Sequence, residues 1–175
     1  MVESQKYNII KKIDSIEIRN YPEMILALAE KYEDNQAFGI LFNYISGKNQ
    51  VKEKINMTSP VMNSKQIAMT TPVLSEKYYF AFIMPSMYTL DTIPVPIDDH
   101  IHITVEPEKI MAVIGFSGYI NEKKINKNQD SLFQILQKNQ IKIKGNTVIM
   151  RYNSPFSLPF LRRNEIGVEI ENVKN

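Results

Sequence analysis

Two histidines stand two residues apart, at His100 and His102, and they are the only imidazoles in the chain. On a strand such residues share a face, so both rings could reach one metal ion. A stable transition-metal site needs further ligands, which would have to come from Asp98, Asp99 or Glu106. Because spacing alone is weak support, we interpret the pair as half-exposed histidines after an acidic turn, and we predict no metal site.

A run of polar and charged residues, Arg162-Arg163-Asn164-Glu165, precedes the last apolar segment. Adjacent arginines are typical of sites that bind a carboxylate or a phosphate. The same charges could instead form ion pairs that tie strands together. The candidates are Arg19 and Arg163 as cations and Glu17 and Glu165 as anions. Structural ion pairs are common, so this second interpretation is preferred.

Aromatic side chains offer the clearest binding surface in the sequence. Phe38 and Phe42 lie four residues apart, which places them on one face of a helix. A buried helix face would need the same stripe, so core packing is the alternative for this pair. Phe156, Leu158 and Phe160 stand in a segment too rich in proline for regular structure. That composition favours an apolar lid or the wall of a pocket.

Common catalytic signatures are absent from the sequence. It has no Walker A loop, no G-x-G-x-x-G, no G-x-S-x-G and no H-E-x-x-H. No set of nucleophile, base and orienting group can be assembled, so we do not expect an enzyme. The chain has zero cysteines, which excludes disulfides, thiolate metal sites and iron–sulfur clusters.

Charge and hydropathy restrict the partners. The 175 residues carry 21 Lys+Arg and 19 Asp+Glu, a formal net charge of +2. No basic run exceeds two residues, which argues against nucleic acid. The longest apolar stretch, Met24–Ala29, is far shorter than the roughly 20 residues that cross a bilayer, and no secretory signal is visible at the N-terminus. We therefore expect a cytoplasmic protein with neither a nucleic-acid nor a membrane partner.

Short apolar runs broken by proline predict strands in the first part of the chain, at Ser15–Tyr21 and Glu23–Tyr32. The hydrophobic period then changes to that of a helix. This helix is predicted over residues 35–46, with Asp34 as its N-cap and Gly47 at its end.

A seven-residue motif follows and occurs twice. Ile55–Val61 (Ile-Asn-Met-Thr-Ser-Pro-Val) returns twelve residues later as Ile67–Val73 (Ile-Ala-Met-Thr-Thr-Pro-Val). The proline in each copy cannot donate a hydrogen bond, so these strands are expected at sheet edges or to end at the proline. Asn63 and Ser64, within Met62–Gln66, favour a turn between the copies.

Strands and one helix are also predicted in the rest of the chain. An irregular loop is expected at 85–100 and a second amphipathic helix over 121–140, with Leu132, Ile135 and Leu136 on one side. The strands are predicted at Tyr78–Met84, His100–Val105, Lys109–Phe116, Thr147–Tyr152 and Glu165–Glu171. Gly145 is expected to open the last two of these strands, and a loop at 153–161 to separate them. This order predicts a single α+β domain, 1–175, with two β-α-β-β halves at about 7–77 and 78–171.

Five segments in the same order resemble the SOUL haem-binding protein family. They are Ile16–Tyr21, Tyr44–Asn49, the doubled methionine motif, Phe82–Ser86 and Arg162–Ile166. Together they lie within residues 7–170, and the two-copy motif is most similar to the bacterial and archaeal branch. The resemblance implies a distorted antiparallel β-barrel of eight or nine strands, flanked by two α-helices and built from a duplicated unit.

The resemblance also implies tetrapyrrole binding in an apolar groove between the first helix and the late proline-rich loop. By motif, the groove residues are Phe38, Phe42 and Asn43 on the helix and Phe156, Ser157 and Leu158 in the loop, to which the aromatic pattern adds Phe160. Haem or a porphyrin would be the ligand, and folding would not require it.

Two features of the family's sites are absent from this sequence. One animal branch has a histidine, proposed as an iron ligand, where this chain has Asn20, and a carboxamide is a poor ligand for haem iron. Another branch places basic side chains near the groove, where this chain has Asn43 and Ser157 or Leu158. Lys48 or Arg162 would have to meet the propionates instead. We therefore expect binding without histidine ligation.

Two hypotheses of function remain open at this point. The first is non-catalytic binding of haem, a porphyrin or another flat apolar anion. The alternative is a general binding module for bulky aromatic compounds, with the gyrase-inhibitor-like fold and no role in haem binding. Sites of that second kind usually hold a buried acid for cationic ligands, and Glu17 and Glu165 are the candidates. The oligomeric state is left open.

Overall fold

The computed structural model describes residues 3–30, 32–51, 54–64, 79–153 and 157–171. Its contacts divide the chain into two compact units, Met1–Gln5 with Glu23–Pro107 and Lys6–Pro22 with Glu108–Asn175. Each unit therefore consists of two separate stretches of the chain, whereas the predicted halves, 7–77 and 78–171, are each one continuous stretch. The chain passes from one unit to the other at Pro22 and at Pro107. The strands on either side of each proline belong to different units because each pairs with strands that are distant in sequence.

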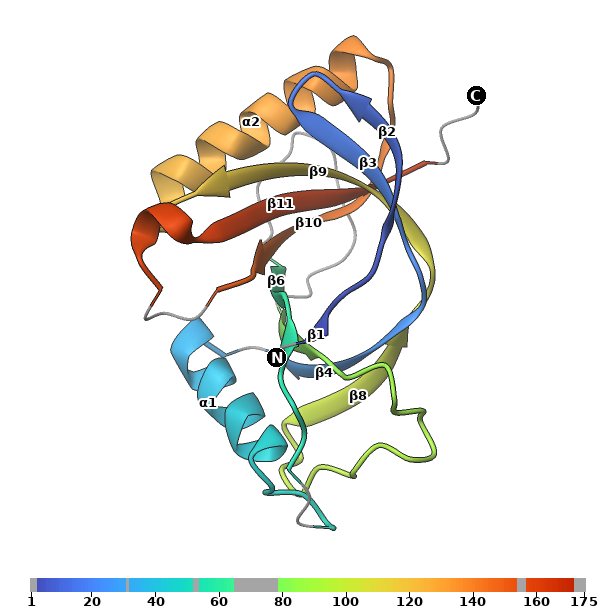
Figure 1. Ribbon diagram of the computed structural model, residues 1–175, viewed down its shortest axis with the longest axis vertical. Coiled ribbons are helices and arrows are strands. Elements are labelled where there is room, and N and C mark those ends of the chain that lie inside the picture. The colour runs from blue at the N-terminus through green and yellow to red at the C-terminus, as the bar shows by residue number, and fades with distance from the viewer. Residues whose placement is uncertain (1–2, 31, 52–53, 65–78, 154–156, 172–175) are drawn as a thin grey trace. The chain divides into compact units, whose positions relative to one another are not determined.

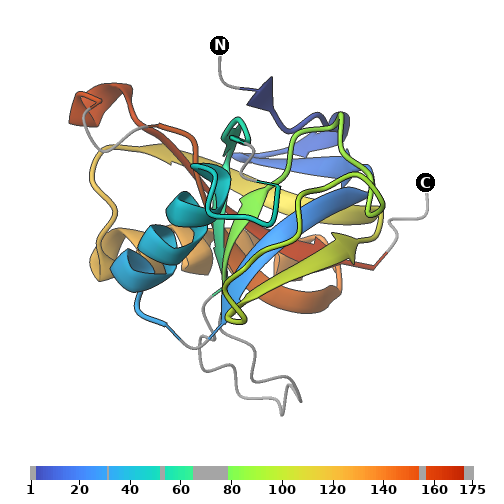
Figure 2. The same ribbon diagram turned by 90° about the horizontal axis from the view of Figure 1, so that it is seen from below.

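The first unit contains an antiparallel sheet in the order β6-β7-β4-β8 (Figure 1). Its strands are β4 (Met24–Glu30), β6 (Val61–Ser64), β7 (Tyr79–Ile83) and β8 (Ile101–Glu106). Helix α1 (Asp34–Ile45) packs on β4 and β7 (Figure 2). Two short strands, β1 (Glu3–Ser4) and β5 (Thr58–Ser59), pair in parallel.

The second unit contains an antiparallel sheet in the order β2-β3-β9-β11-β10. Its strands are β2 (Asn8–Ile13), β3 (Ile16–Tyr21), β9 (Lys109–Ser117), β10 (Ile143–Arg151) and β11 (Arg163–Ile170). Helix α2 (Glu122–Lys138) packs on β9 and β11, and a 3₁₀ turn, η1 (Pro159–Leu161), precedes β11.

Apart from the short strand β5 and the turn η1, each unit contains a β-α-β-β run, β4-α1-β6-β7 in one and β9-α2-β10-β11 in the other. The α+β class, with antiparallel strands and two helices, is confirmed. Closure of the strands into a barrel stays a prediction. Within the described residues, no helix is long and apolar enough to cross a membrane.

Helix α1 agrees with its prediction except at its start. Glu33, not Asp34, is the N-cap, and Asp34 occupies the first turn, where the helix dipole favours a carboxylate. Gly47 follows the helix with a φ of 109°, a left-handed conformation that suits glycine and ends helices. Leu41 and Tyr44 on the inner side of α1 are fully buried against this unit's core.

Two predictions about local structure are wrong. Asn63 and Ser64 do not form a turn, because they pair with Phe80 and Tyr79 and extend β6; sheet pairing overrides their local preference for turns. Gly145 does not open a strand, because it lies inside β10, where the register with β11 shifts. The second copy of the motif, Ile67–Val73, lies outside the described residues.

Helix α2 is capped as its sequence requires. The Asn121 side chain accepts a hydrogen bond from the Lys124 backbone N–H at 2.9 Å. Leu132 and Leu136 are fully buried, whereas Ile135 is only partly buried.

Candidate functional site

The predicted aromatic pair on α1 is the exposed end of a larger cluster in the first unit. The rings of Phe38 and Phe42 stack with centroids 5.8 Å apart and planes 13° apart. Phe38 also meets Phe82 edge-on at 5.5 Å and Phe80 edge-on at 6.3 Å. Phe80 and Phe82 point to one face of β7 because they are two residues apart. We refer to these four residues as the phenylalanine cluster.

Burial changes steeply along the phenylalanine cluster. Phe80 and Phe82 are buried, Phe38 is partly buried, and Phe42 is 48% exposed. Core packing, the alternative for this pair, is confirmed for Phe38, whereas a ligand contact at the exposed Phe42 stays a prediction. A rigid ring with an exposed face can stack on a flat ligand without first losing much conformational freedom.

Few charged groups stand on α1. Asp34 is its only charged residue, and Asn43, the other predicted groove residue on this helix, is exposed beside Phe42. Lys48 lies just beyond the helix and is exposed, and its backbone N–H donates to the Asn43 carbonyl. The first unit thus has an exposed aromatic ring face on α1, with a lysine near the C-terminal end of that helix.

The late loop belongs to the second unit, so its predicted groove residues are described by themselves. Leu158 and Phe160 are 56% and 70% exposed, and the Ser157 carbonyl accepts a hydrogen bond from Arg162 Nε at 2.9 Å. The predicted residue Phe156 lies outside the described residues. The loop therefore presents apolar side chains to solvent.

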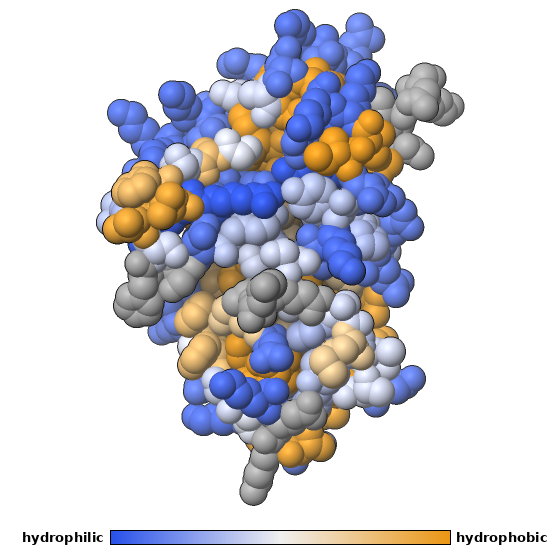
Figure 3. Space-filling view, viewed as in Figure 1, coloured by the Kyte–Doolittle hydropathy of each residue, from blue (hydrophilic) through white to orange (hydrophobic). Residues whose placement is uncertain are grey.

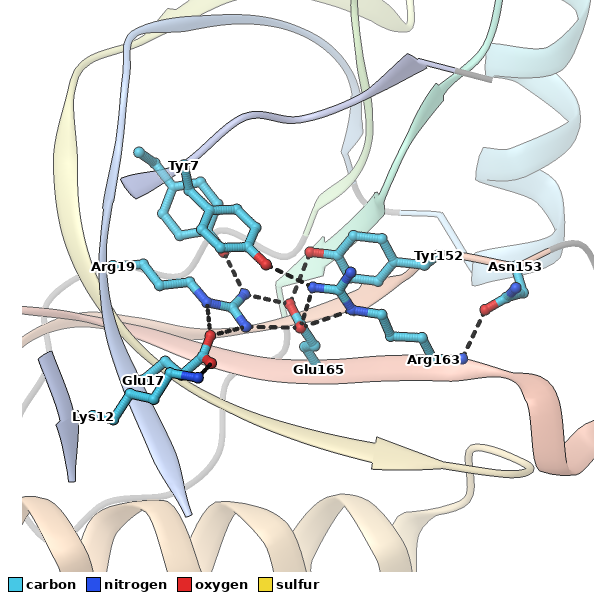
Figure 4. Close-up of polar contacts among 9 residues, drawn as sticks. Tyr7, Lys12, Glu17, Arg19, Tyr152, Asn153, Arg163 and Glu165 are labelled. Carbon is cyan, nitrogen blue, oxygen red and sulfur yellow. Dashed lines mark hydrogen bonds and ion pairs between the residues drawn. The ribbon is translucent and has the colours of Figure 1, made fainter. Parts of the chain in front are cut away.

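Four of the charged residues singled out in the sequence, Glu17, Arg19, Arg163 and Glu165, meet in one network of the second unit (Figure 4), whereas Arg162 binds the Ser157 carbonyl. Arg19 donates to both carboxylate oxygens of Glu165, from Nη1 to Oε2 at 2.7 Å and from Nη2 to Oε1 at 3.0 Å. Arg163 adds two bonds to Glu165 Oε1, and the Tyr152 hydroxyl donates to Oε2 at 2.8 Å. The preferred interpretation, structural ion pairs, is confirmed.

The same network continues to the edge of the sheet. Arg19 Nε donates to Glu17 Oε2 at 2.8 Å, and Lys12 lies 3.1 Å from Glu17 Oε1. The Arg19 guanidinium also lies over the Tyr7 ring, 4.1 Å from its centroid. Neither Glu17 nor Glu165 is left without a cation, so the acid expected for cationic ligands is already neutralised at both positions.

The Glu165 carboxylate stays charged although its side chain is only 3% exposed. Burial alone would raise the pKa of Glu165, but hydrogen bonds and charge from Arg19 and Arg163 outweigh it and hold that pKa below its ordinary value. Burial also raises the pKa of Tyr21, to about 12, so this neighbour of Arg19 remains neutral.

The two histidines do not lie together in a strand. His100 precedes β8, its Nδ1 lies 2.7 Å from Asp98 Oδ1, and its ring meets Tyr32 edge-on. His102 lies in β8 and is exposed. Over the ranges that the structure describes, no group of three or more His, Asp and Glu side chains is placed to hold a metal ion.

Asn20, at the position of the histidine in one SOUL branch, makes a structural contact. Its Nδ2 donates to Glu108 Oε1 at 2.6 Å, which joins β3 to the start of β9 within the second unit. A tetrapyrrole would therefore find no imidazole at this position, and its ring would have to supply the binding surface.

Comparison with known families decides the relationship. The family model described as SOUL heme-binding protein matches residues 2–169, almost the whole chain. The chain belongs to the SOUL family. Comparison with curated protein sequences gives no match.

Solved structures share the fold of this SOUL protein at low sequence identity. The C-terminal domain of EcmrR is 11% identical, with a TM-score of 0.66, over 95% of this chain and 99% of that chain. EcmrR in a complex with DNA gives a TM-score of 0.63, also at 11% identity, over 90% of this chain and 57% of that chain. A hydrolase from Listeria innocua is 9% identical, with a TM-score of 0.60, over 93% and 94% of the two chains. At such identity the likeness shows the fold alone.

Sequence reasoning missed two groups of residues. Phe80 and Phe82 back the α1 pair, and the alternation within the predicted strand Tyr78–Met84 could have placed them on one face. Tyr119 and Leu161 are 60% and 63% exposed, which no sequence pattern indicates.

Removal of the Glu165 charge should destabilise the protein strongly at neutral pH. We expect Glu165→Gln to lower the free energy of unfolding by about 3–5 kcal/mol at pH 7, because two arginines lose their buried partner. The folded-state pKa of Glu165 is lowered, so its contribution is present above the ordinary value of 4.5 and is lost as the pH falls through the folded-state pKa. Urea unfolding across this range should show the variant and the parent converging in acid.

The matched control is Glu169→Gln, which breaks the exposed pair with Lys144 at 2.8 Å. This change should cost less than about 1 kcal/mol. Equal losses in the two variants, or a loss for Glu165→Gln that does not depend on pH, would contradict the assignment.

Proposed function

We propose that this SOUL-family protein binds haem or a porphyrin without catalysing a reaction, and that the exposed face of Phe42 is a principal contact. The family match supports the ligand class. The observation that carries the location is the phenylalanine cluster, which is anchored in the core at Phe82 and exposed at Phe42.

Ring contact alone can supply useful affinity. Burying an aromatic or aliphatic side chain against a ligand contributes roughly 1.5–3 kcal/mol, and ring stacking adds about 0.5–1.5 kcal/mol. A micromolar complex needs about 8 kcal/mol after the cost of association is met. Several apolar contacts together reach this range, so the proposal needs no axial ligand from the protein.

The alternative, a general binding module for bulky aromatic compounds, has less support where the ligand is a cation. Its expected acid would be Glu165 or Glu17, and both carboxylates are held by arginine or lysine. A cationic ligand would have to displace these cations from buried ion pairs, at a large cost. A flat apolar anion meets no such obstacle on α1.

Absorbance titration of the apo-protein with ferric haem and with iron-free protoporphyrin tests the proposal directly. We expect saturable one-to-one binding of both, with affinities that agree within about threefold, because the ring and not the iron makes the contacts. No saturable binding of either compound would overturn the proposed function. A strong preference for haem would show that an iron ligand dominates.

Phe42→Asp tests the location on α1. We expect at least a tenfold loss of porphyrin affinity, because a carboxylate replaces the stacking ring and repels the propionates. Gln36→Glu adds the same charge to an exposed position of α1, and Leu90→Asp places it on an equally exposed apolar side chain of the same unit. Both controls should bind like the parent. Unchanged affinity in Phe42→Asp would remove Phe42 from the site.

In the second unit, taken by itself, we propose porphyrin contacts through Ser157, Leu158 and Phe160 of the late loop, as the family resemblance suggests. Leu158→Asp should weaken porphyrin binding several-fold without changing the unfolding transition, because Leu158 is 56% exposed. The same titration measures the effect, and an unaltered affinity would exclude Leu158 as a contact.

A further inference from the structure

Four large apolar or aromatic side chains protrude together from one corner of the second unit. Tyr119, Leu158, Phe160 and Leu161 are 60%, 56%, 70% and 63% exposed. Figure 3 shows an apolar group at the left edge, where Figure 1 places η1, with hydrophilic residues beside it. We refer to these four residues as the η1 corner.

Specific contacts hold the η1 corner in shape. The Leu161 N–H donates to the Leu158 carbonyl at 3.0 Å, which closes the 3₁₀ turn and brings these two side chains to the same side. Asn164 Nδ2 donates to the Gly118 carbonyl at 2.9 Å, which joins the turn to the segment that carries Tyr119. The exposed side chains are therefore presented by ordered backbone.

Basic residues surround the η1 corner. The Arg162 guanidinium lies over the Tyr119 ring, 4.9 Å from its centroid, and Lys124 Nζ donates to the Ser117 carbonyl at 3.0 Å. Segments 117–127 and 157–163 carry four basic residues outside the Glu165 network (Lys123, Lys124, Lys127 and Arg162) and one acid (Glu122), although the whole chain has 21 basic and 19 acidic residues. These segments therefore carry a net positive charge.

Two of these lysines stand where a helix disfavours them. Lys123 and Lys124 lie in the first turn of α2, at the positive end of the helix dipole. Their placement costs stability, as does the exposure of Phe160 and Leu161. Both costs are offset if the corner meets a surface that is negatively charged outside and apolar inside.

We propose that the η1 corner docks on the surface of an anionic lipid bilayer. Phe160 and Leu161 enter the interfacial region, Tyr119 lies at headgroup level, and Arg162 and Lys123 face the lipid phosphates. A bilayer fits better than a protein groove because the apolar side chains protrude from a turn and basic residues stand beside them. Basic charge with a protruding apolar tip is the pattern of peripheral membrane contacts.

The η1 corner shares Leu158 and Phe160 with the contacts proposed for the porphyrin, so the membrane contact is tested on ligand-free protein. It differs from the expectation of no membrane partner. That expectation came from the shortness of the apolar stretches, which excludes a spanning segment and not a surface contact.

The absence of tryptophan allows a direct test. Phe160→Trp gives the full chain a single indole at the tip, and Leu90→Trp places one at another exposed apolar site, in the other unit. With ligand-free protein and vesicles of equal parts phosphatidylcholine and phosphatidylserine, we expect a blue shift and quenching by brominated lipid for Phe160→Trp only. Unchanged emission of Phe160→Trp, or an equal response of both variants, would overturn the proposal.

Vesicle flotation separates the apolar and electrostatic parts. Phe160→Asp combined with Leu161→Asp should lower partitioning on the order of tenfold or more, whereas Leu90→Asp should not change it.

Lys123→Glu should lower partitioning roughly fivefold or more, whereas Lys11→Glu, at an exposed position of β2, should have little effect. Added salt should weaken binding of the parent. Equal binding to vesicles of phosphatidylcholine alone, or an equal loss of binding in both lysine variants, would overturn the anionic-lipid assignment. The two lysine variants still test the proposal if the double aspartate variant does not fold.

Discussion

The pairing of Arg19 with Glu165 is the interaction on which the second unit depends. Both side chains are almost fully buried, and a buried charge without a partner costs several kcal/mol. Arg19 comes from β3 and Glu165 from β11, so the pair requires β9 to lie between these strands in its observed register. The network thus fixes one arrangement of three strands that are far apart in sequence.

The two units use the same β-α-β-β order but fill their interiors differently. In the first unit, the aromatic rings of β7 and α1 pack together and leave Phe42 at the surface. In the second unit, β3 alternates Ile16 and Ile18 with Glu17 and Arg19, so one side of the strand is apolar and the other carries the ion pairs. One unit therefore provides a face suited to flat apolar molecules, and the other is held by polar contacts that leave its acids occupied.

Local periodicity was sufficient to predict most helices and strands, and residue type was sufficient to predict the ion pairs. Arg163 stands two residues before Glu165 and Arg19 two residues after Glu17, so these arginines could be named before their strands were placed. Long-range pairing was beyond reach, because the sequence does not state that β3 joins β9 while β4 joins β8. The turn expected at Asn63 and Ser64 failed for the same reason, since the partner strand β7 decides their conformation.

Exposure was the other property that the sequence could not provide, and it governs both proposals. The sequence does not tell whether a phenylalanine is buried or exposed, and only the structure shows that Phe38 packs on the core while Phe42 is 48% exposed. Asn20 illustrates the converse, because its bond to Glu108 gives it a structural role at a position that the family resemblance marks for an iron ligand. With that position occupied by an amide, affinity has to come from the ring face of the ligand. Contacts of this kind distinguish porphyrins by shape and polarity and hardly by the metal at their centre, so selectivity in this SOUL protein should follow the outline of the ligand.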